Sequence, residues 1–253
     1  MKISVITAVF NARETVADAL ESALGQTHPD IELIVIDGAS TDGTKELLES
    51  YKDRFGVFVS EPDHGIYDAL NKGIAHATGD VVGFLHADDL YADPHALAKI
   101  AEVFTDTSVD AAYGDLVYVS KNDPDHIVRY WKSGEYSSEK LKAGWMPPHP
   151  TFYVRRSVYE LLGAFDTSFH IAADYDCMLR FLGCKQIKCK YIPQVIVKMR
   201  VGGVSNRSLG NILRKSREDY QALKANGVGG FSALILKNVS KLGQFIFHKL
   251  PII

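Results

Sequence analysis

Short apolar segments rich in β-branched residues alternate with segments of helical periodicity through residues 1–119. Apolar runs bounded by turns predict buried strands, and apolar positions three or four residues apart predict amphipathic helices. The predicted strands are Ile3–Phe10, Ile31–Ile36, Val57–Ser60, Val81–Leu85 and Ala111–Val119, and the predicted helices are 13–26, Thr41–Tyr51, Ile66–Ala77 and 94–104. Because such alternation builds βαβ units, it predicts an α/β fold with a mostly parallel sheet.

The second half of the chain is less regular than the first. Residues 120–150 are polar and aromatic, which predicts loops and a short helix. Helices are predicted at 156–163, 174–183 and 208–226, and a further strand at Ile187–Val197.

The composition is that of a globular protein. Hydrophobic residues make up 46% and charged residues 23% of the 253 residues, which argues against disordered and fibrous classes. The three cysteines, Cys177, Cys184 and Cys189, match neither a disulfide framework nor a zinc-binding pattern, so reduced thiols in a cytoplasmic protein are predicted. Neither a signal peptide nor a membrane-spanning helix is predicted, because the apolar runs are too short.

Charge is distributed unevenly along the chain. The net charge is −3, but residues 198–253 contain ten basic and two acidic residues, which gives +8. Residues 1–197 then carry −11. A basic tail behind an acidic body indicates either an anionic surface as partner or a solvated helix face.

Polar, acidic or small residues follow the early predicted strands directly. These positions are Asn11, Asp37, Glu61–Gly65 and His86–Asp89. Parallel α/β sheets bind ligands at the carboxyl ends of their strands, so these residues are expected at one edge of the sheet. Their chemistry is typical of a site for a cation and a nucleotide.

Four segments in order resemble the motifs of family 2 glycosyltransferases of the GT-A fold. They are Ser4–Asn11, Ile34–Thr44, Gly65–Gly73 with Ala77–Asp80, and His86–Asp89. Each motif alone is weak, whereas four at the right spacing are a strong signal. The resemblance implies a Rossmann-like α/β/α sandwich with a mostly parallel central sheet and a C-terminal helical extension.

The resemblance also implies how the chain is divided. It covers about residues 1–206, a GT-A domain in which 1–110 bind the nucleotide sugar and 111–206 bind the acceptor. Residues 207–253 then form a basic amphipathic helical tail.

The implied activity is inverting transfer of a sugar from a nucleotide sugar, with a divalent metal, Mn²⁺ or Mg²⁺, at the diphosphate. His86-Ala87-Asp88-Asp89 stands where the family carries its Asp-x-Asp metal motif, and Asp88 is the predicted ligand. His86 departs from the usual Asp, so it either binds the metal or bonds the ribose or a phosphate. Asp89 is expected to support the site or to cap a helix.

The resemblance assigns further residues to the nucleotide. Asp37 is expected to accept a hydrogen bond from an imide N–H of the base, which favours UDP, while Gly38 replaces the second acidic residue of the motif. Phe10 either cradles the base or belongs to the core. The remaining predicted nucleotide contacts are Thr7 and Asn11 at the end of the first strand, and Asp63, Tyr67 and Asn71 near the ribose. For Asn71, satisfying buried backbone is an equal alternative.

The segment Ala172–Asp176 resembles the acidic motif that supplies the catalytic base. Inverting transfer needs one carboxylate to accept the proton of the acceptor hydroxyl, and Asp174 is predicted in that role. Asp176 is the alternative base or a helix cap. His149 is expected either to face the acceptor or to be structural, and Arg200 either to offset diphosphate charge or to form an ordinary ion pair.

Residues Phe231, Ile235, Val239, Leu242 and Ile246 recur at helical spacing, with Lys237, Lys241, Gln244 and His248 on the other face. This amphipathic helix is expected to pack on the domain or to lie on an acidic membrane, peripherally on its cytoplasmic face. The predicted acceptor is a glycan or a lipid-linked sugar.

Two other functions compete with sugar transfer. A catalytically degenerate sugar-nucleotide-binding module is supported only by His86, and Asp88 and Asp174 argue against it. A nucleotidyltransferase needs a glycine-rich basic loop after its first strand, where this chain has Asn-Ala-Arg-Glu. Nucleic-acid binding is not predicted, because no recognition motif accompanies the basic tail.

Overall fold

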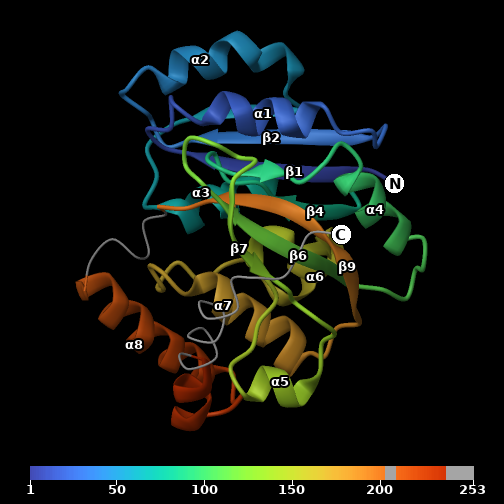
Figure 1. Cartoon of the computed structure of the whole chain (residues 1–253), viewed down its shortest axis with the longest axis vertical. Coiled ribbons are helices and arrows are strands. Elements are labelled where there is room, and N and C mark those ends of the chain that lie inside the picture. Colours follow the sequence, from blue (N-terminus) through green and yellow to red (C-terminus); the bar gives the residue numbers. More distant parts are fainter. Residues whose placement is uncertain (203–208, 238–253) are drawn as a thin grey trace.

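One mixed sheet of nine strands runs through the part of the chain that the computed structural model describes, residues 1–202 and 209–237 (Figure 1). The strands are β1 (Ile3–Val9), β2 (Ile31–Asp37), β3 (Val57–Ser60), β4 (Val81–Phe84), β5 (Leu90–Tyr91), β6 (Ala111–Val119), β7 (Ile127–Trp131), β8 (Tyr153–Arg155) and β9 (Cys189–Arg200). Their order is β3-β2-β1-β4-β8-β6-β9-β5, and β7 pairs with β6.

The first four strands form the parallel half of the sheet. β1 pairs in parallel with β2 and β4, and β2 pairs in parallel with β3. The register places Val9 beside Asp37, and Asp37 beside Ser60. Three carboxyl ends therefore meet at one edge of the sheet, as the alternation of strands and helices predicts.

The other half of the sheet is mixed. β8 lies antiparallel between β4 and β6, β9 runs parallel to β6, and β5 and β7 form antiparallel edges. Strands β5 and β7 were not predicted. They contain two and five residues, and the residues of β7 are exposed or half-buried, so a buried apolar run does not mark them.

Helices cover both faces of the sheet. They are α1 (Val16–Leu24), α2 (Thr44–Tyr51), α3 (Ile66–His76), α4 (Ala96–Val103), α5 (Ser138–Lys142), α6 (Arg156–Leu162), α7 (Ala173–Met178) and α8 (Leu209–Ala225). Short 3-10 turns lie at Lys52–Arg54 and His149–Thr151, and a π-helical segment, Leu179–Cys184, continues α7.

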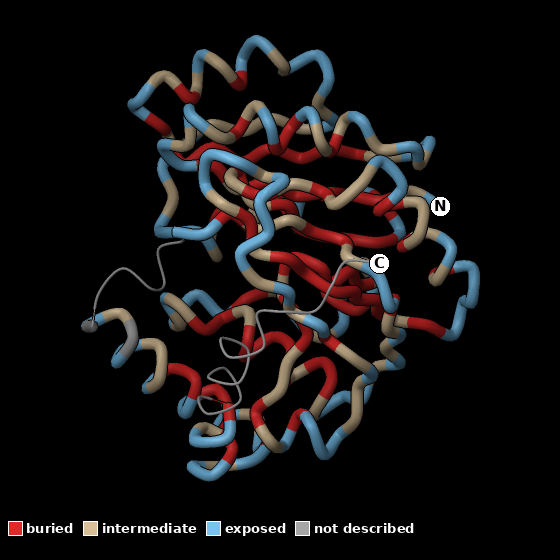
Figure 2. The backbone as a smooth tube through the Cα atoms, in the orientation of Figure 1, coloured by how far each residue is buried: buried red, intermediate tan, exposed pale blue. Residues whose placement is uncertain are grey.

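Two apolar clusters form the core, one on each face of the sheet. Buried residues accordingly concentrate along the central strands, whereas the loops are largely exposed (Figure 2). Alternation along β1 sends Val5 into the cluster with α1, α2 and α4, and Ile6 into the cluster with α3, α6, α7 and α8. Gly73 of α3 lies so close to Ile6 that a methyl group there would collide with it. Each fully buried aliphatic side chain contributes about 1.5–3 kcal/mol, so both faces hold the sheet in place.

The C-terminal helices pack against the second half of the sheet domain. α8 contacts α7, and residues 231–237 form a further helical segment. Lys237 was expected on the polar face of an amphipathic helix, but it is buried, with Nζ 2.9 Å from Asp219 Oδ1 and 3.0 Å from the ring centre of Tyr175. Phe231 and Ile235 are instead 66% and 47% exposed.

The rest of the predicted amphipathic helix, from Val239 to Ile246 with Lys241, Gln244 and His248, lies outside the described residues. Among residues 1–202 and 209–237, the helices are too short or too polar to cross a membrane. The division of the chain at residue 206 remains a prediction, and hydrogen bonds cross that position.

The Glu32 side chain links the amino ends of β1, β2 and β4 by hydrogen bonds. The carboxylate is 7% exposed and accepts hydrogen bonds from Lys2 Nζ at 2.7 Å, Ser4 Oγ at 2.6 Å, and Thr78 N and Oγ1 at 2.8 and 2.6 Å. Burial raises the pKa of Glu32, but these hydrogen bonds outweigh burial and lower the pKa to about 2.

We expect Glu32→Gln to lower the free energy of unfolding by about 2 kcal/mol near pH 7, because an amide replaces a charged acceptor of four hydrogen bonds. A carboxylate with a lowered folded-state pKa stabilises the fold above its ordinary pKa of 4.5 and loses this contribution as pH falls toward 2. The difference between the two proteins should therefore shrink on acidification. Urea denaturation near pH 7 and near pH 3 measures this difference in the free energy of unfolding, and Glu49→Gln, at an exposed position, is the control. Equal differences at both pH values would contradict this account.

Candidate functional site

The loops that follow β1 and β2 are bonded to each other at the carboxyl edge of the sheet. Asn11 N donates to Ser40 Oγ at 2.9 Å, and Thr41 N donates to Asn11 Oδ1 at 2.9 Å. Asn11 and Ala39 have positive φ angles of 48° and 59°, which non-glycine residues seldom adopt. Backbone held in this region commonly marks a binding site, because the surrounding contacts must enforce it.

The carboxylate of Asp37 is sealed inside this edge. Asp37 is 0% exposed and accepts hydrogen bonds from Ser40 Oγ at 2.5 Å, from Ser40 N at 3.2 and 3.3 Å, and from Ser60 Oγ at 2.7 Å. These contacts use both carboxylate oxygens. The structure therefore places Asp37 where it shapes the loop after β2 and is closed to solvent.

A second carboxylate lies over the backbone of Gly38. A methyl group on Gly38 would collide with Asp63 Oδ2 and would lie 3.3 Å from the Phe10 ring. The other oxygen, Asp63 Oδ1, accepts the N–H of Gly65 at 2.8 Å. Phe10 is 64% exposed, so its core alternative is wrong. Asp63 thus fills the space above Gly38, where the family motif has an acidic side chain.

The segment His86–Asp89 follows β4 at the same edge of the sheet. Asp88 is half-buried, and its backbone carbonyl accepts a hydrogen bond from Arg200 Nη1 at 3.1 Å. Asp89 is 1% exposed and accepts the Arg200 N–H at 3.2 Å. A strand, β5, follows Asp89 directly, so the helix-cap alternative is wrong. Burial, and then the nearby Asp88 charge, raises the pKa of Asp89 well above its ordinary range.

His86 and His149 face each other beneath this segment. Their ring centres are 5.6 Å apart, and His149 also stacks on Phe84 at 5.3 Å. His86 Nδ1 and His149 Nε2 are buried and have no hydrogen-bond partner among the described residues. Burial lowers the pKa of His149 to about 4 and also lowers that of His86, although Asp174 acts in the opposite direction on both. Both imidazoles are therefore neutral near pH 7.

Asp174 lies beside this histidine pair, in the first turn of α7. It is half-buried, and the Tyr67 hydroxyl of α3 lies 3.2 Å from its Oδ1. The same hydroxyl donates to the Ile171 carbonyl at 2.8 Å. Tyr67, predicted near the ribose, thus joins α3 to the segment that carries Asp174.

The family model for Glycosyl transferase family 2 matches residues 4–171 of the 253 residues. The chain belongs to glycosyltransferase family 2. The matched range runs from the second residue of β1 through β8, contains His86–Asp89 and His149, and ends just before α7.

Several curated relatives of this family 2 chain are glycosyltransferases. A PGL/p-HBAD biosynthesis glycosyltransferase of Mycobacterium bovis is 27% identical over 208 residues, which cover 80% of this chain and 78% of the relative. An uncharacterised glycosyltransferase of Mycobacterium tuberculosis is 34% identical over 183 residues, covering 70% and 68%. One from Nostoc sp. is 32% identical over 221 residues, covering 81% and 66%.

Solved structures confirm the predicted fold of this family 2 chain. S. aureus TarS 1-349 in complex with UDP has a TM-score of 0.64 at 18% identity, covering 88% of this chain and 65% of that one. The mannosyltransferase PcManGT from Pyrobaculum calidifontis, in complex with GDP-Man and Mn²⁺, has a TM-score of 0.66 at 19% identity, covering 99% and 76%. The match to a longer TarS chain covers 90% of this chain but only 39% of the length of that chain. The α/β, GT-A architecture is therefore confirmed.

Two other predicted site residues of this family 2 enzyme form hydrogen bonds within the protein. Asn71 donates to the Phe165 carbonyl and accepts from the Phe165 N–H, both at 2.9 Å, which matches the alternative that it satisfies buried backbone. Asp176 is buried and accepts from Asn226 Nδ2 at 2.7 Å, and burial raises its pKa. Its carboxylate thus contacts Asn226, the residue directly after α8.

Arg200 is 4% exposed and bonded on several sides. Besides the Asp88 carbonyl, its guanidinium donates to the Lys121 carbonyl at 3.1 Å and pairs with Asp18 at 2.5 Å. These contacts fix the end of β9 against the segment that contains Asp88. The structure therefore places Arg200 as a support behind the family motif. Thr7 is 1% exposed, with an Oγ1 that lacks a partner among the described residues.

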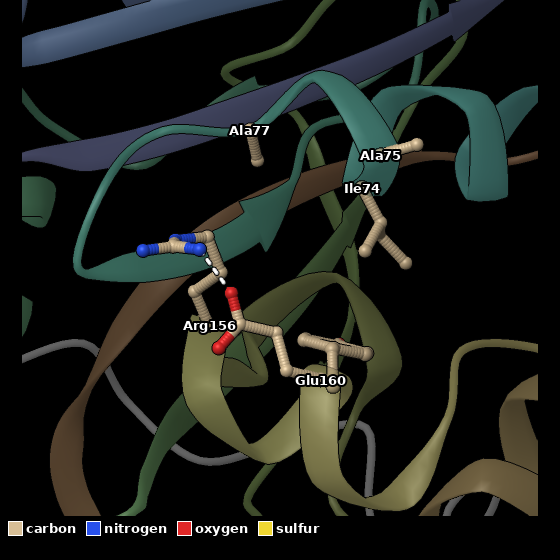
Figure 3. A pocket seen from close by; sticks show the side chains of 6 residues that line it. Ile74, Ala75, Ala77, Arg156 and Glu160 are labelled. Atoms are coloured by element: carbon tan, nitrogen blue, oxygen red, sulfur yellow. Dashed lines mark hydrogen bonds and ion pairs between the residues drawn. The ribbon is translucent and has the colours of Figure 1, made fainter.

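A pocket of about 210 Å³ lies elsewhere, between the end of α3 and α6 (Figure 3). Arg156 and Glu160, one turn apart on α6, form an ion pair that lines it on one side, and Ile74 and Ala77 line it on the other. Arg156 also bonds the carbonyls of Gly79 and Asp80, just before β4. This pocket is thus at the amino end of β4, opposite His86 and Asp88, and is separate from the candidate site.

The candidate site therefore has two groups of residues. Phe10, Asn11 and Asp63 gather around the loop after β2, and His86, Asp88, His149, Asp174 and Tyr67 gather beyond β4. Three contributors were not predicted: Ser40 and Ser60, which seal Asp37, and Glu218 of α8, which bonds the segment before Asp174. Glu218 has no sequence signal of its own, because its partners lie 46 to 48 residues away.

Proposed function

We propose that this family 2 glycosyltransferase moves a hexosyl or N-acetylhexosaminyl group from a nucleotide sugar, with UDP as the nucleotide, to a hydroxyl of a glycan or lipid-linked acceptor, with inversion. The observation that carries the proposal is the grouping of Asp88, His86, His149 and Asp174 beyond β4, beside the loops of β1 and β2. The two carboxylates at this edge, Asp88 and Asp174, argue against a catalytically degenerate module. The loop after β1 reads Asn-Ala-Arg-Glu rather than a glycine-rich basic sequence, which argues against a nucleotidyltransferase.

The base of the nucleotide is assigned to the loop after β2. Phe10 offers an exposed aromatic face, and Asp63 Oδ2 lies beside it above Gly38. Because Asp37 is closed to solvent, we assign the acceptor for an imide N–H to Asp63 and a supporting role to Asp37. A carboxylate facing an imide donor favours uracil over bases that lack this donor.

The divalent cation is assigned to Asp88, which is the partly exposed carboxylate of the family motif. His86 fits the same site, because its Nδ1 is buried and lacks a partner in the described chain. A carboxylate–imidazole pair suits Mn²⁺ better than Mg²⁺. The described residues offer no group of three or more metal-ligating side chains, so diphosphate oxygens and water would supply the other ligands of a bound cation. When bound, the cation neutralises charge on the departing diphosphate.

Asp174 is assigned as the base. The acceptor oxygen forms a bond to the anomeric carbon as the bond from that carbon to the diphosphate breaks, and the acceptor proton passes to Asp174. Tyr67 holds the carboxylate through Oδ1, which leaves Oδ2 for the acceptor. His149, neutral near pH 7, lies on the same side and is assigned to the acceptor. The active protein thus needs Asp174 deprotonated and oriented.

The C-terminal segment is assigned to an acidic membrane surface on the cytoplasmic side, which would present a lipid-linked acceptor. Phe231 and Ile235 are exposed while Lys237 faces the domain, so these apolar side chains are available to a partner. Leu213 and Tyr220 of α8 are also exposed, at 73% and 40%, and Tyr220 meets the Phe231 ring at 6.4 Å. Basic residues of the tail supply the attraction to anionic lipid.

We expect UDP to bind more tightly with Mn²⁺ than without it, because the cation and the diphosphate complete each other's coordination. Asp88→Ala should weaken binding at least about 10-fold with Mn²⁺ and change it little without, since it removes a metal ligand. Calorimetric titration with UDP, GDP and dTDP measures this, with Asp53→Ala as an exposed control. If no nucleotide binds, or if binding ignores both Mn²⁺ and Asp88, the donor-site assignment fails.

We expect Asp174→Asn to lower kcat about 1,000-fold, because an asparagine amide cannot accept the acceptor proton. UDP affinity and the thermal midpoint should stay near those of the parent protein. The rate is measured as release of the nucleoside diphosphate from a nucleotide sugar whose nucleotide is the one that binds in the titration. A variant that keeps more than a tenth of the parent kcat would remove Asp174 from the role of base.

We expect the double variant Phe231→Ser with Ile235→Ser to bind anionic lipid vesicles at least about 10-fold more weakly than the parent, because two apolar side chains no longer enter the interface. Co-sedimentation with phosphatidylglycerol vesicles measures binding, and phosphatidylcholine vesicles test the part of charge. Leu161→Ser is the control, since Leu161 is 81% exposed on α6. Equal binding by the double variant and the parent would exclude this surface.

A further inference from the structure

Glu218 of α8 accepts three backbone hydrogen bonds with one carboxylate oxygen. His170 N, Ile171 N and Ala172 N lie 3.0, 2.7 and 3.1 Å from its Oε2. The side chain is 7% exposed. Successive amides that converge on one anion form a compact, directional contact, and charge makes each bond stronger than a neutral one. The path of residues 170–172 is therefore fixed by a side chain from a distant helix.

The same segment is held from its other side by α3. Tyr67 donates to the Ile171 carbonyl at 2.8 Å, and its oxygen is 3.2 Å from Asp174 Oδ1. The backbone around Ile171 thus has its amides on Glu218 and its carbonyl on Tyr67. Asp174 follows at once, in the first turn of α7. A shift of residues 170–172 would move the start of α7 and the carboxylate that it carries.

Helix α8 is itself anchored close to this contact. Asn226 Nδ2 donates to Asp176 Oδ1 at 2.7 Å, and Asp219, which is 2% exposed, pairs with Lys237 at 2.9 Å. These contacts attach α8 to α7 and to the C-terminal segment. Glu218 differs from them because its partners are the backbone groups that immediately precede the carboxylate of Asp174. The position of α8 is therefore also fixed by contacts that do not involve residues 170–172.

We propose that Glu218 is a positioning residue for Asp174: by collecting the amides of residues 170–172, it sets the direction of the carboxylate that accepts the acceptor proton. The proposal rests on the assignment of Asp174 as the base. Under this proposal, α8 contributes to catalysis by orienting the Asp174 carboxylate. Misplacing a reacting group by about 1 Å costs about 100-fold in rate, so a modest shift of α7 is enough to impair transfer.

The test is Glu218→Gln in the full chain, compared with Glu32→Gln as matched control. Both changes replace a buried, multiply bonded carboxylate by an amide, but Glu32 lies at the opposite end of the sheet from Asp174. We expect Glu218→Gln to lower kcat about 10- to 100-fold, with the donor KM and the UDP affinity unchanged. Glu32→Gln should keep the parent kcat at a comparable loss of thermal stability.

A double-mutant cycle separates this proposal from the assignment of the base. If Asp174 is the base, adding Glu218→Gln to Asp174→Asn should cause no further loss of rate. If Asp174→Asn is active, the base assignment fails, whatever Glu218 does. If Asp174→Asn is inactive while Glu218→Gln keeps kcat within twofold, the positioning role is overturned. Loss of rate by Glu32→Gln equal to that by Glu218→Gln would also overturn it, because stability alone would then explain both.

Hydrogen exchange tests the contact itself and does not require the variant to fold. In the parent protein the amides of Ile171 and Ala172 should exchange at least about 100-fold more slowly than in an unstructured peptide, because each donates to Glu218. In Glu218→Gln their exchange should rise while that of β1 amides does not. Unprotected amides at 171 and 172 in the parent protein would overturn the proposal, even if the variant fails to fold.

Discussion

The parallel register of β1, β2, β3 and β4 is the constraint on which the rest of this structure depends. It brings Val9, Asp37 and Ser60 level with one another, so the loops that follow these strands begin at one edge. Loops that start together can satisfy each other's polar groups, as Asn11 and Ser40 do. A slip of one residue would turn Ile6 to the wrong face of the sheet and separate these partners. Core packing and the site are therefore fixed by the same register.

The sequence predicted the parts of the fold whose signals are local. β1, β2, β3 and β4 are short apolar runs, and each was predicted within a residue or two at either end. The roles of Asp37 and Asp63 were harder to predict, because which carboxylate is sealed and which lies over Gly38 depends on how two loops pack. Lys237 was misplaced for a related reason: helical spacing gives the faces of a helix but not which face meets the domain.

Charge at the candidate site follows from burial. His86 and His149 lie near carboxylates that favour imidazolium, yet burial outweighs them and keeps both rings neutral near pH 7. The negative charges of Asp88 and Asp174 are therefore not offset by the histidine pair. The Arg200 guanidinium donates to Asp18 and to backbone carbonyls, including that of Asp88, and so holds the segment His86–Asp89 in place. Uncompensated carboxylate charge at this edge of the sheet favours binding of a cation. A diphosphate, which is itself negative, binds there best together with a cation.

The two sides of α8 have different surroundings, and this difference changes how the C-terminal segment is understood. Glu218 and Asp219 of α8, and Asn226 directly after it, face α7 and its neighbours, whereas Leu213 and Tyr220 are exposed. A chain that ended at residue 206 would leave the amides of residues 170–172 without their shared acceptor, just ahead of Asp174. Buried amides without partners are costly, so this segment would rearrange. Under the assignments proposed above, the helix that would lie nearest to a membrane is thus also the one that orients the carboxylate proposed as the base.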